Sequence, residues 1–189
     1  PTYPRHPAVL AAQALTAQAA CGGRLTLGIG LSHQPVIEGM YGLSFDKPVR
    51  HLREYLEVLM PLVDQQPASF VGETLTGRLA LDVPGAQPVP VLVAALGPQL
   101  LRVAGARTAG TVTWMVGPAT IAELTTPTIC AAAADAGYPD PRIVCSLPVS
   151  VTDDVDAARD RASKLFQIYG QLPSYRAMLD REGAAGPED

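Results

Sequence analysis

A histidine stands directly behind a glycine-rich strand end in the first third of the chain. The segment reads Gly28-Ile29-Gly30-Leu31-Ser32-His33. An imidazole exchanges protons near neutral pH, so His33 is a candidate proton donor, and Ser32 offers a weaker version of the same chemistry. The glycines allow a flat ligand or a phosphate to approach the backbone closely. The alternatives are a tight strand exit without a ligand and a loop histidine bonded to backbone or water.

A second candidate site is a glycine-proline pair between an apolar run and a helical segment. Leu96-Gly97-Pro98-Gln99 joins the two directly, and Gly117-Pro118 repeats the arrangement further along the chain. Unpaired backbone amides and the helix dipole at such a helix start suit an anion, typically a phosphate. An ordinary strand-to-helix turn is the alternative at both pairs.

The chain lacks a self-sufficient catalytic set. We find no Ser-His-Asp pattern, no paired catalytic carboxylates, no Walker loop and no metal motif. The three cysteines, Cys21, Cys130 and Cys145, form no CxxC pair and indicate free thiols in a reducing cytoplasm. These absences favour an enzyme whose cofactor carries the chemistry.

Composition narrows the class of protein. Apolar residues make up 48% and charged residues 17%, which is typical of a soluble globular domain, and the formal net charge of −4 argues against a nucleic-acid partner. No apolar run is long enough to cross a bilayer, so we predict no membrane association. We expect one domain over residues 1–189. The start at Pro1 and the turn-like sequence at the other end indicate truncation at both ends.

Short apolar runs alternate with longer amphipathic segments along the chain. Arg24–Gly30 predicts a strand with Leu25, Leu27 and Ile29 on one face. Continuous apolar runs predict strands buried on both faces at Val89–Leu96, Thr111–Val116 and Ile143–Val151. Helices are predicted at Pro7–Ala20, Arg50–Val63, Pro98–Arg107, Pro118–Ala136, Asp153–Tyr169 and Pro173–Glu182. Successive strand-helix modules build a parallel α/β sheet through right-handed crossovers. An open doubly wound sheet and a closed barrel both remain compatible with this pattern.

Residues 32–88 interrupt the alternation. They hold one clear helix and a polar stretch rich in Pro and Gly, in which Ser69–Gly77 predicts a small hairpin. Long insertions after a strand of such a fold cover its active face, so we expect residues 32–88 to do so here. Trp114, inside an apolar run, is interpreted as a core residue.

These motifs, in this order, resemble the luciferase-like monooxygenase superfamily. The first resemblance is Arg5-His6-Pro7 followed by Gly23-Arg24 and Leu27-Gly28-Ile29-Gly30. The second is the alanine-rich run, Gly-Pro pair, AG-containing helix and following strand over Val91–Pro118. The loop SHQPVIEGMYGLSFDKP and the segment QLPSYRAMLDREG are similar to the actinobacterial branch of coenzyme F420-dependent oxidoreductases. The resemblance covers essentially the whole chain.

The resemblance implies a fold and a cofactor. The fold would be α/β, a partial TIM (β/α)8 barrel holding strands four to seven, with the insertion after strand four. The resemblance places a deazaflavin ring near Ile29, Gly30, Leu31 and Ser32, and its phosphate near Leu96-Gly97-Pro98. It implies hydride transfer between coenzyme F420 and a small organic substrate, His33 as proton donor, and a homodimer.

Some residues depart from the family's pattern. Sugar-phosphate dehydrogenases of the family place an acidic residue where Leu31 stands, which argues against sugar-phosphate oxidation. Leu31, Ser32 and His33 offer no permanent cation, which favours the deazaflavin over FMN. The alternatives are an FMN-dependent luciferase-like monooxygenase and a non-catalytic or inactive barrel fragment.

Overall fold

A parallel sheet forms the centre of the molecule. The computed structural model describes residues 1–186, and its four-stranded sheet has the order β1-β4-β5-β6. Each neighbouring pair runs parallel. The strands are β1 (Leu27–Ile29), β4 (Val91–Ala94), β5 (Gly110–Trp114) and β6 (Arg142–Ser146). The predicted parallel α/β class is therefore confirmed.

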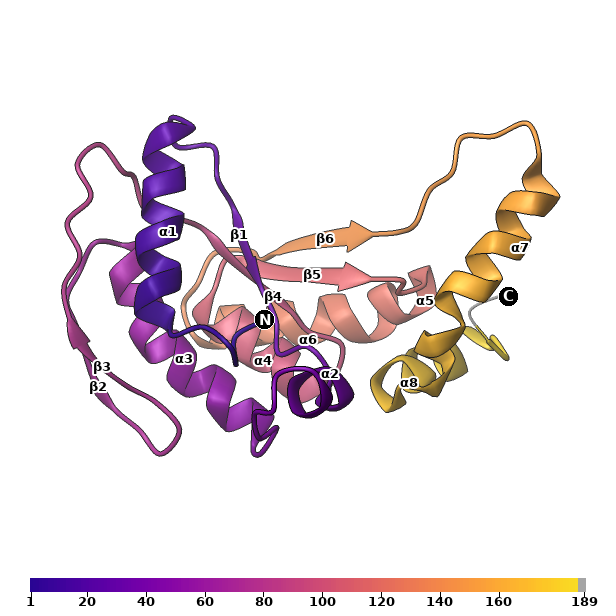
Figure 1. The fold of residues 1–189 in the computed structure, drawn as a ribbon, viewed down its shortest axis with the longest axis horizontal. Helices are drawn as coiled ribbons and strands as arrows, with labels where there is room; N and C mark the ends of the chain where they lie inside the picture. Colours follow the sequence, from indigo (N-terminus) through magenta and orange to yellow (C-terminus); the bar gives the residue numbers. More distant parts are fainter. Residues whose placement is uncertain (187–189) are drawn as a thin grey trace.

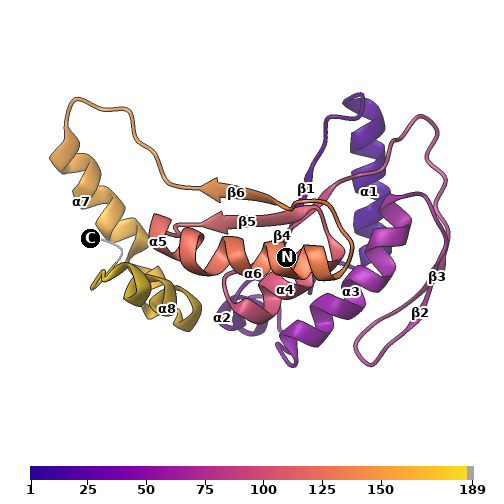
Figure 2. The ribbon, with the colours of Figure 1, turned by 180° about the vertical axis from the view of Figure 1, so that it is seen from behind.

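Helices cover one face of this sheet (Figures 1 and 2). They are α1 (Pro7–Ala20), α3 (Pro48–Val63), α4 (Pro98–Arg107) and α6 (Thr126–Asp135). Val91 and Val93 of β4, and Ala95 directly after it, are fully buried on the helix side, whereas Ala94 at the end of the strand is exposed. Because side chains alternate along a strand, the core lies between the sheet and these helices.

Local sequence explains the ends of the first helices. His6 precedes α1, and its Nδ1 accepts a hydrogen bond from the Ala8 amide at 3.2 Å. After the helix, Gly22 and Gly23 adopt positive φ angles of 63° and 81°, which glycine tolerates best. Helix α3 buries an apolar stripe that includes Leu52, Leu56 and Leu59.

The segment 32–88 folds into three pieces. A short helix, α2 (Gln34–Gly39), which we did not predict, follows His33, and α3 comes next. The predicted hairpin is confirmed as β2 (Ala68–Val71) paired antiparallel with β3 (Thr76–Leu79). It packs on α3, and the carboxylate of Glu54 fixes its turn by accepting hydrogen bonds from the backbone amides of Glu73 and Thr74.

The helix predicted over Pro118–Ala136 is interrupted. It consists of α5 (Pro118–Thr120), one π-helical turn, η1 (Ile121–Thr125), and α6. Pro127 lacks the amide hydrogen of a regular helix, and its ring crowds the carbonyl one turn earlier. A π-helical turn before it relieves this conflict.

The prediction of a buried strand over Ile143–Val151 is only partly right, because a strand forms in the first half of the run but none of its residues is fully buried. Strand β6 ends at Ser146, and Leu147, Val149 and Val151 are exposed, the last of them completely. Strand β6 is an edge of the sheet within residues 1–186, and Pro148 cannot donate a ladder hydrogen bond. The chain then leaves the sheet and forms α7 (Val155–Phe166), η2 (Gln167–Gln171) and α8 (Pro173–Glu182), at the end of the molecule far from α1 (Figure 1).

The end of α8 and the hydropathy of the helices complete the description of the fold. Helix α8 stops at Gly183, as predicted, with φ 73° in the left-handed region. In the described part of the chain, no helix combines the length and apolarity that spanning a membrane requires.

Candidate active site

A cavity of about 760 Å³ opens where the parallel strands end. It uses the carboxyl ends of all four strands, which is where α/β folds bind ligands. Its walls come from residues 31–35, Phe45, Pro48, residues 94–97, Leu100, residues 112–114, Ser146 and residues 171–175.

The end of β1 supplies one wall. Leu31 and Ser32 line the cavity, whereas Ile29 and Gly30 lie behind the lining. Gly30 packs so closely on Ala94 that an added Cβ would stand 3.1 Å from that side chain. Ser32 has a φ of 63°, a strained conformation for a non-glycine residue and one that clusters at functional sites.

His33 stands at the cavity wall at the start of α2. Neither ring nitrogen forms a hydrogen bond within residues 1–186, so His33 keeps both a donor and an acceptor for a ligand. Burial lowers the pKa of the imidazole below its usual value, which keeps the ring neutral at neutral pH. The ring lies 5.8 Å from that of Tyr175, centroid to centroid.

The loop before α4 forms another wall. Leu96 and Gly97 line the cavity, and Pro98 is the exposed first residue of the helix. A Cβ added at Gly97 would meet no protein atom within 4 Å, so packing does not demand glycine there. The amides of Gln99 and Leu100 have no hydrogen-bond acceptor among the described residues. Space and free donors at a helix start are the conditions for anion binding.

The equivalent loop at Gly117 is different. There the carboxylate of Glu182 accepts hydrogen bonds from the amides of Thr120, at 2.6 Å, and Ala119, at 3.3 Å. A Cβ on Gly117 would collide with this carboxyl group. The anion at this helix start is therefore the protein's own, and it ties α8 to α5.

The cavity also uses residues that the sequence reasoning did not assign to a site. Trp114, interpreted as a core residue, lines the cavity and packs edge-on against Phe166 at 6.0 Å. Its Nε1 and the Oγ1 of Thr113 are buried without a hydrogen-bond partner in the part of the chain described. Tyr175 comes from α8, and only its place just after the helix-opening Pro173 could have drawn attention to it.

Charge is absent from the lining. None of the described lining residues is Asp, Glu, Lys or Arg. Residues 1–186 also contain no group of three or more metal-ligating side chains. Apart from the helix start at Gly97, the part of the cavity built by this chain therefore suits an uncharged, largely apolar ligand.

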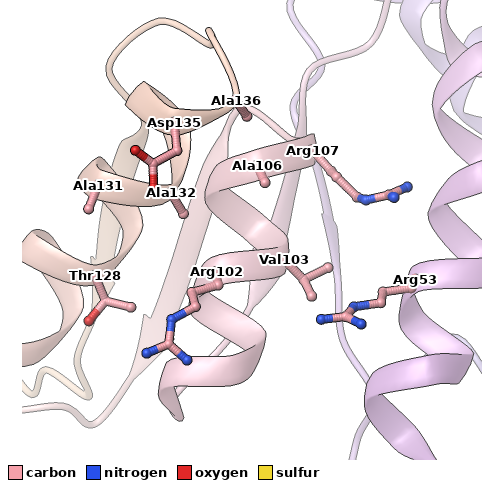
Figure 3. A pocket seen from close by; sticks show the side chains of 10 residues that line it. All are labelled: Arg53, Arg102, Val103, Ala106, Arg107, Thr128, Ala131, Ala132, Asp135 and Ala136. Carbon is pink, nitrogen blue, oxygen red and sulfur yellow. The ribbon is translucent and has the colours of Figure 1, made fainter.

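A second concavity, of about 590 Å³, lies on the outer helix surface between α3, α4 and α6 (Figure 3). Arg53, Arg102 and Arg107 surround it, with Asp135 on the far side. Arg107 pairs with Glu57, and Arg53 and Arg102 are exposed. Exposed guanidinium groups are ordinarily solvated. This concavity also includes no described residue from the carboxyl ends of the strands, so we place the candidate site in the first cavity.

Comparison with known proteins agrees with this architecture. The family model described as luciferase-like monooxygenase matches residues 1–189. The chain belongs to this family. A luciferase-like relative, 5,10-methylenetetrahydromethanopterin reductase of Archaeoglobus fulgidus, is 29% identical over 190 residues, covering 96% of this chain and 55% of the relative.

Two solved structures show the same arrangement. The coenzyme F420-dependent tetrahydromethanopterin reductase of Methanopyrus kandleri superposes with a TM-score of 0.77 and 25% identity, over 96% of this chain and 57% of the reductase. The oxygenating component of 3,6-diketocamphane monooxygenase of Pseudomonas putida, in complex with FMN, has a TM-score of 0.67 and 20% identity, over 98% and 58%. This chain thus spans just over half of these luciferase-like proteins, and the predicted partial TIM barrel is confirmed.

Proposed function

We propose that the protein carrying this chain transfers hydride between coenzyme F420 and an organic substrate. Membership of the luciferase-like family and the similarity to methylenetetrahydromethanopterin reductase support an oxidoreductase. The observation that carries the proposal is the loop at Gly97, where free space and two unpaired amides adjoin the cavity.

The residues of this loop fit the phosphate of the cofactor. Gln99 and Leu100 would donate their amide hydrogens to it, and Gly97 would let it approach the backbone. Leu31 and Ser32 would contact the ring system, with Ile29 and Gly30 supporting them from behind. When bound, the deazaflavin supplies the C5 position that accepts or donates the hydride.

The chain's own contribution is to orient the substrate, exclude water and move a proton. With an alcohol as substrate, the bound cofactor would supply the hydride acceptor, and neutral His33 would accept the proton of the alcohol oxygen. In the reverse direction the same imidazole returns the proton to the carbonyl oxygen. Residues 32–48 would cover the substrate, since their cavity-lining members face it from one side.

An FMN-dependent monooxygenase is the second candidate function. The FMN-bound relative has the same fold, and FMN also carries a phosphate that the Gly97 loop would accommodate. The absence of Lys and Arg from the described cavity lining favours the deazaflavin, because a cation commonly helps to hold the FMN phosphate.

The test is a titration of the full-length protein with coenzyme F420 and, separately, with FMN, followed by intrinsic tryptophan fluorescence. Saturable binding of the deazaflavin alone is the expected result. Preference for FMN would move the protein to the monooxygenase function. Binding of neither cofactor by the folded protein would refute both and leave a non-catalytic role.

A further inference from the structure

Tyr175 is a buried phenol whose hydroxyl has no protein partner. The residue is only 7% exposed, and its ring packs edge-on against Tyr169 at 4.7 Å. Buried tyrosine hydroxyls usually find a hydrogen-bond partner. Here no residue of the described chain bonds to this hydroxyl.

The free hydroxyl belongs to a residue that lines the candidate active site. Within residues 1–186, the fully enclosed side-chain polar atoms without a partner are Thr113 Oγ1, Trp114 Nε1 and Thr120 Oγ1. The Tyr175 hydroxyl is not one of them, and Tyr175 lines the cavity. Its unpaired oxygen is therefore not fully enclosed, and it belongs to the cavity wall, which leaves it for a ligand.

The protonation states of Tyr175 and His33 suit an uncharged ligand. Burial, with a smaller effect of Tyr169, raises the pKa of Tyr175 to about 12, so the phenol stays protonated and can donate a hydrogen bond. His33, whose ring lies 5.8 Å away and inclined by 54°, is neutral because burial lowers its pKa. Two neutral groups with free donors thus face the cavity from elements far apart in the sequence.

We infer that Tyr175 is a substrate-binding residue which, opposite His33, holds the oxygen of an uncharged carbonyl compound or alcohol. The inference rests on the proposed function and adds the substrate class. It follows from two independent features, the unpartnered hydroxyl and the uncharged lining. With the Gly97 loop taken by the cofactor phosphate, a carboxylate or phosphate on the substrate would find no counter-charge among the described lining residues.

Helix α8 gives Tyr175 a fixed position. Its far end is tied to α5 by Glu182, and its first turn contributes Pro173, Ser174 and Tyr175 to the cavity wall. Tyr169, the neighbouring ring, does not line the cavity. This contrast provides a matched control in which a second tyrosine hydroxyl is removed a few ångströms away.

The experiment measures binding without any cofactor, by fluorine NMR of the full-length protein in inorganic phosphate buffer, so that phosphate rather than the probe occupies the anion site at Gly97. The neutral probe is para-fluoroacetophenone, and the matched anion is para-fluorobenzoate. We expect the ketone to bind, the carboxylate to bind at least about 10-fold more weakly, and Tyr175→Phe to weaken ketone binding by about 2- to 10-fold, the effect of one lost neutral hydrogen bond. Tyr169→Phe should leave the affinity unchanged.

Three results would overturn the inference. They are equal ketone affinity of wild type and Tyr175→Phe, equal or tighter binding of the carboxylate, and absence of ketone binding at millimolar concentration. Because Tyr175→Phe keeps the ring, an unchanged thermal unfolding temperature shows that the fold is intact, and Tyr175→Trp provides a second variant without the hydroxyl. The cofactor titration is separate, so failure of the proposed function can be distinguished from failure of this inference.

Discussion

Replacing Gly117 by alanine should cost stability because the new methyl group would displace the carboxyl group of Glu182. The ideal Cβ position lies within 2.2 Å of the Glu182 carboxyl carbon, too close for both to stay. The carboxylate would then lose its hydrogen bonds from the Ala119 and Thr120 amides. Hydrogen bonds to charged groups contribute about 1.5–3 kcal/mol, so we expect roughly that loss in addition to the capping cost of alanine. The melting temperature should fall by about 2–4 °C per kcal/mol.

Gly97→Ala is the matched control. Both glycines precede a helix with ordinary φ angles, −86° at Gly97 and −76° at Gly117, so alanine carries the same capping cost, about 0.5–1 kcal/mol, at either position. At Gly97 the methyl group meets no protein atom within 4 Å. Gly97→Ala should therefore be clearly more stable than Gly117→Ala but bind coenzyme F420 more weakly.

Urea unfolding of the full-length variants, followed by circular dichroism, measures the difference. In a Glu182→Ala background, Gly117→Ala should cost only the capping term of about 0.5–1 kcal/mol, because the colliding group is already gone. Equal destabilisation by Gly97→Ala and Gly117→Ala, or full additivity of the double variant, would refute the reasoning.

Three further predictions follow from single contacts. In wild type, the acidic limb of the pH–rate profile for alcohol oxidation should lie below 6.5, the ordinary pKa of histidine, because burial lowers the pKa of His33. His33→Gln should abolish this limb. An unchanged limb would exclude His33 as the base. Thr113→Val should stabilise the fold by roughly 1 kcal/mol in urea unfolding, since it removes a buried hydroxyl without a partner among residues 1–186; a loss of stability would reveal a partner. Burial tends to raise the pKa of Glu54, but hydrogen bonds from Thr74 and Leu75 outweigh it and lower that pKa below 4.5, so its contribution is present above about pH 4.5 and is lost as the pH falls through the folded value. Glu54→Gln should flatten this acid dependence of the urea midpoint, and an unaltered dependence would contradict the assignment.

Much of the fold was predictable because local signals and packing agree. Pro and Gly mark the ends of α1, α4 and α8, whose bounds match the prediction residue for residue. The local signals predicted the wrong secondary structure where contacts between distant residues determine it. The apolar run after Ser146 reads as a strand, yet no neighbour pairs with it in the described chain, and Pro127 shifts one turn of the helix before it into a π-helical form.

The candidate site was only half visible in the sequence. The sequence indicates three of its residues because they follow strand ends, namely Ser32, His33 and Gly97. The structure places all three at one cavity. Tyr175 could not be found in this way, because its role depends on where a distant helix docks. The same holds for Glu182, since nothing in the local pattern shows that its carboxylate reaches the amide of Thr120.

The carboxylate of Glu182 makes two otherwise similar strand-helix modules unequal. The start of α5 binds the Glu182 carboxylate and so holds α8 in place. The start of α4, by contrast, stays open. Of these two helix starts, only the one at Gly97 is therefore open to an anion from solution, and the one at Gly117 does not compete for it. Replacing Glu182 by alanine would open the start of α5 to an anion as well, but it would also release α8, which carries Tyr175.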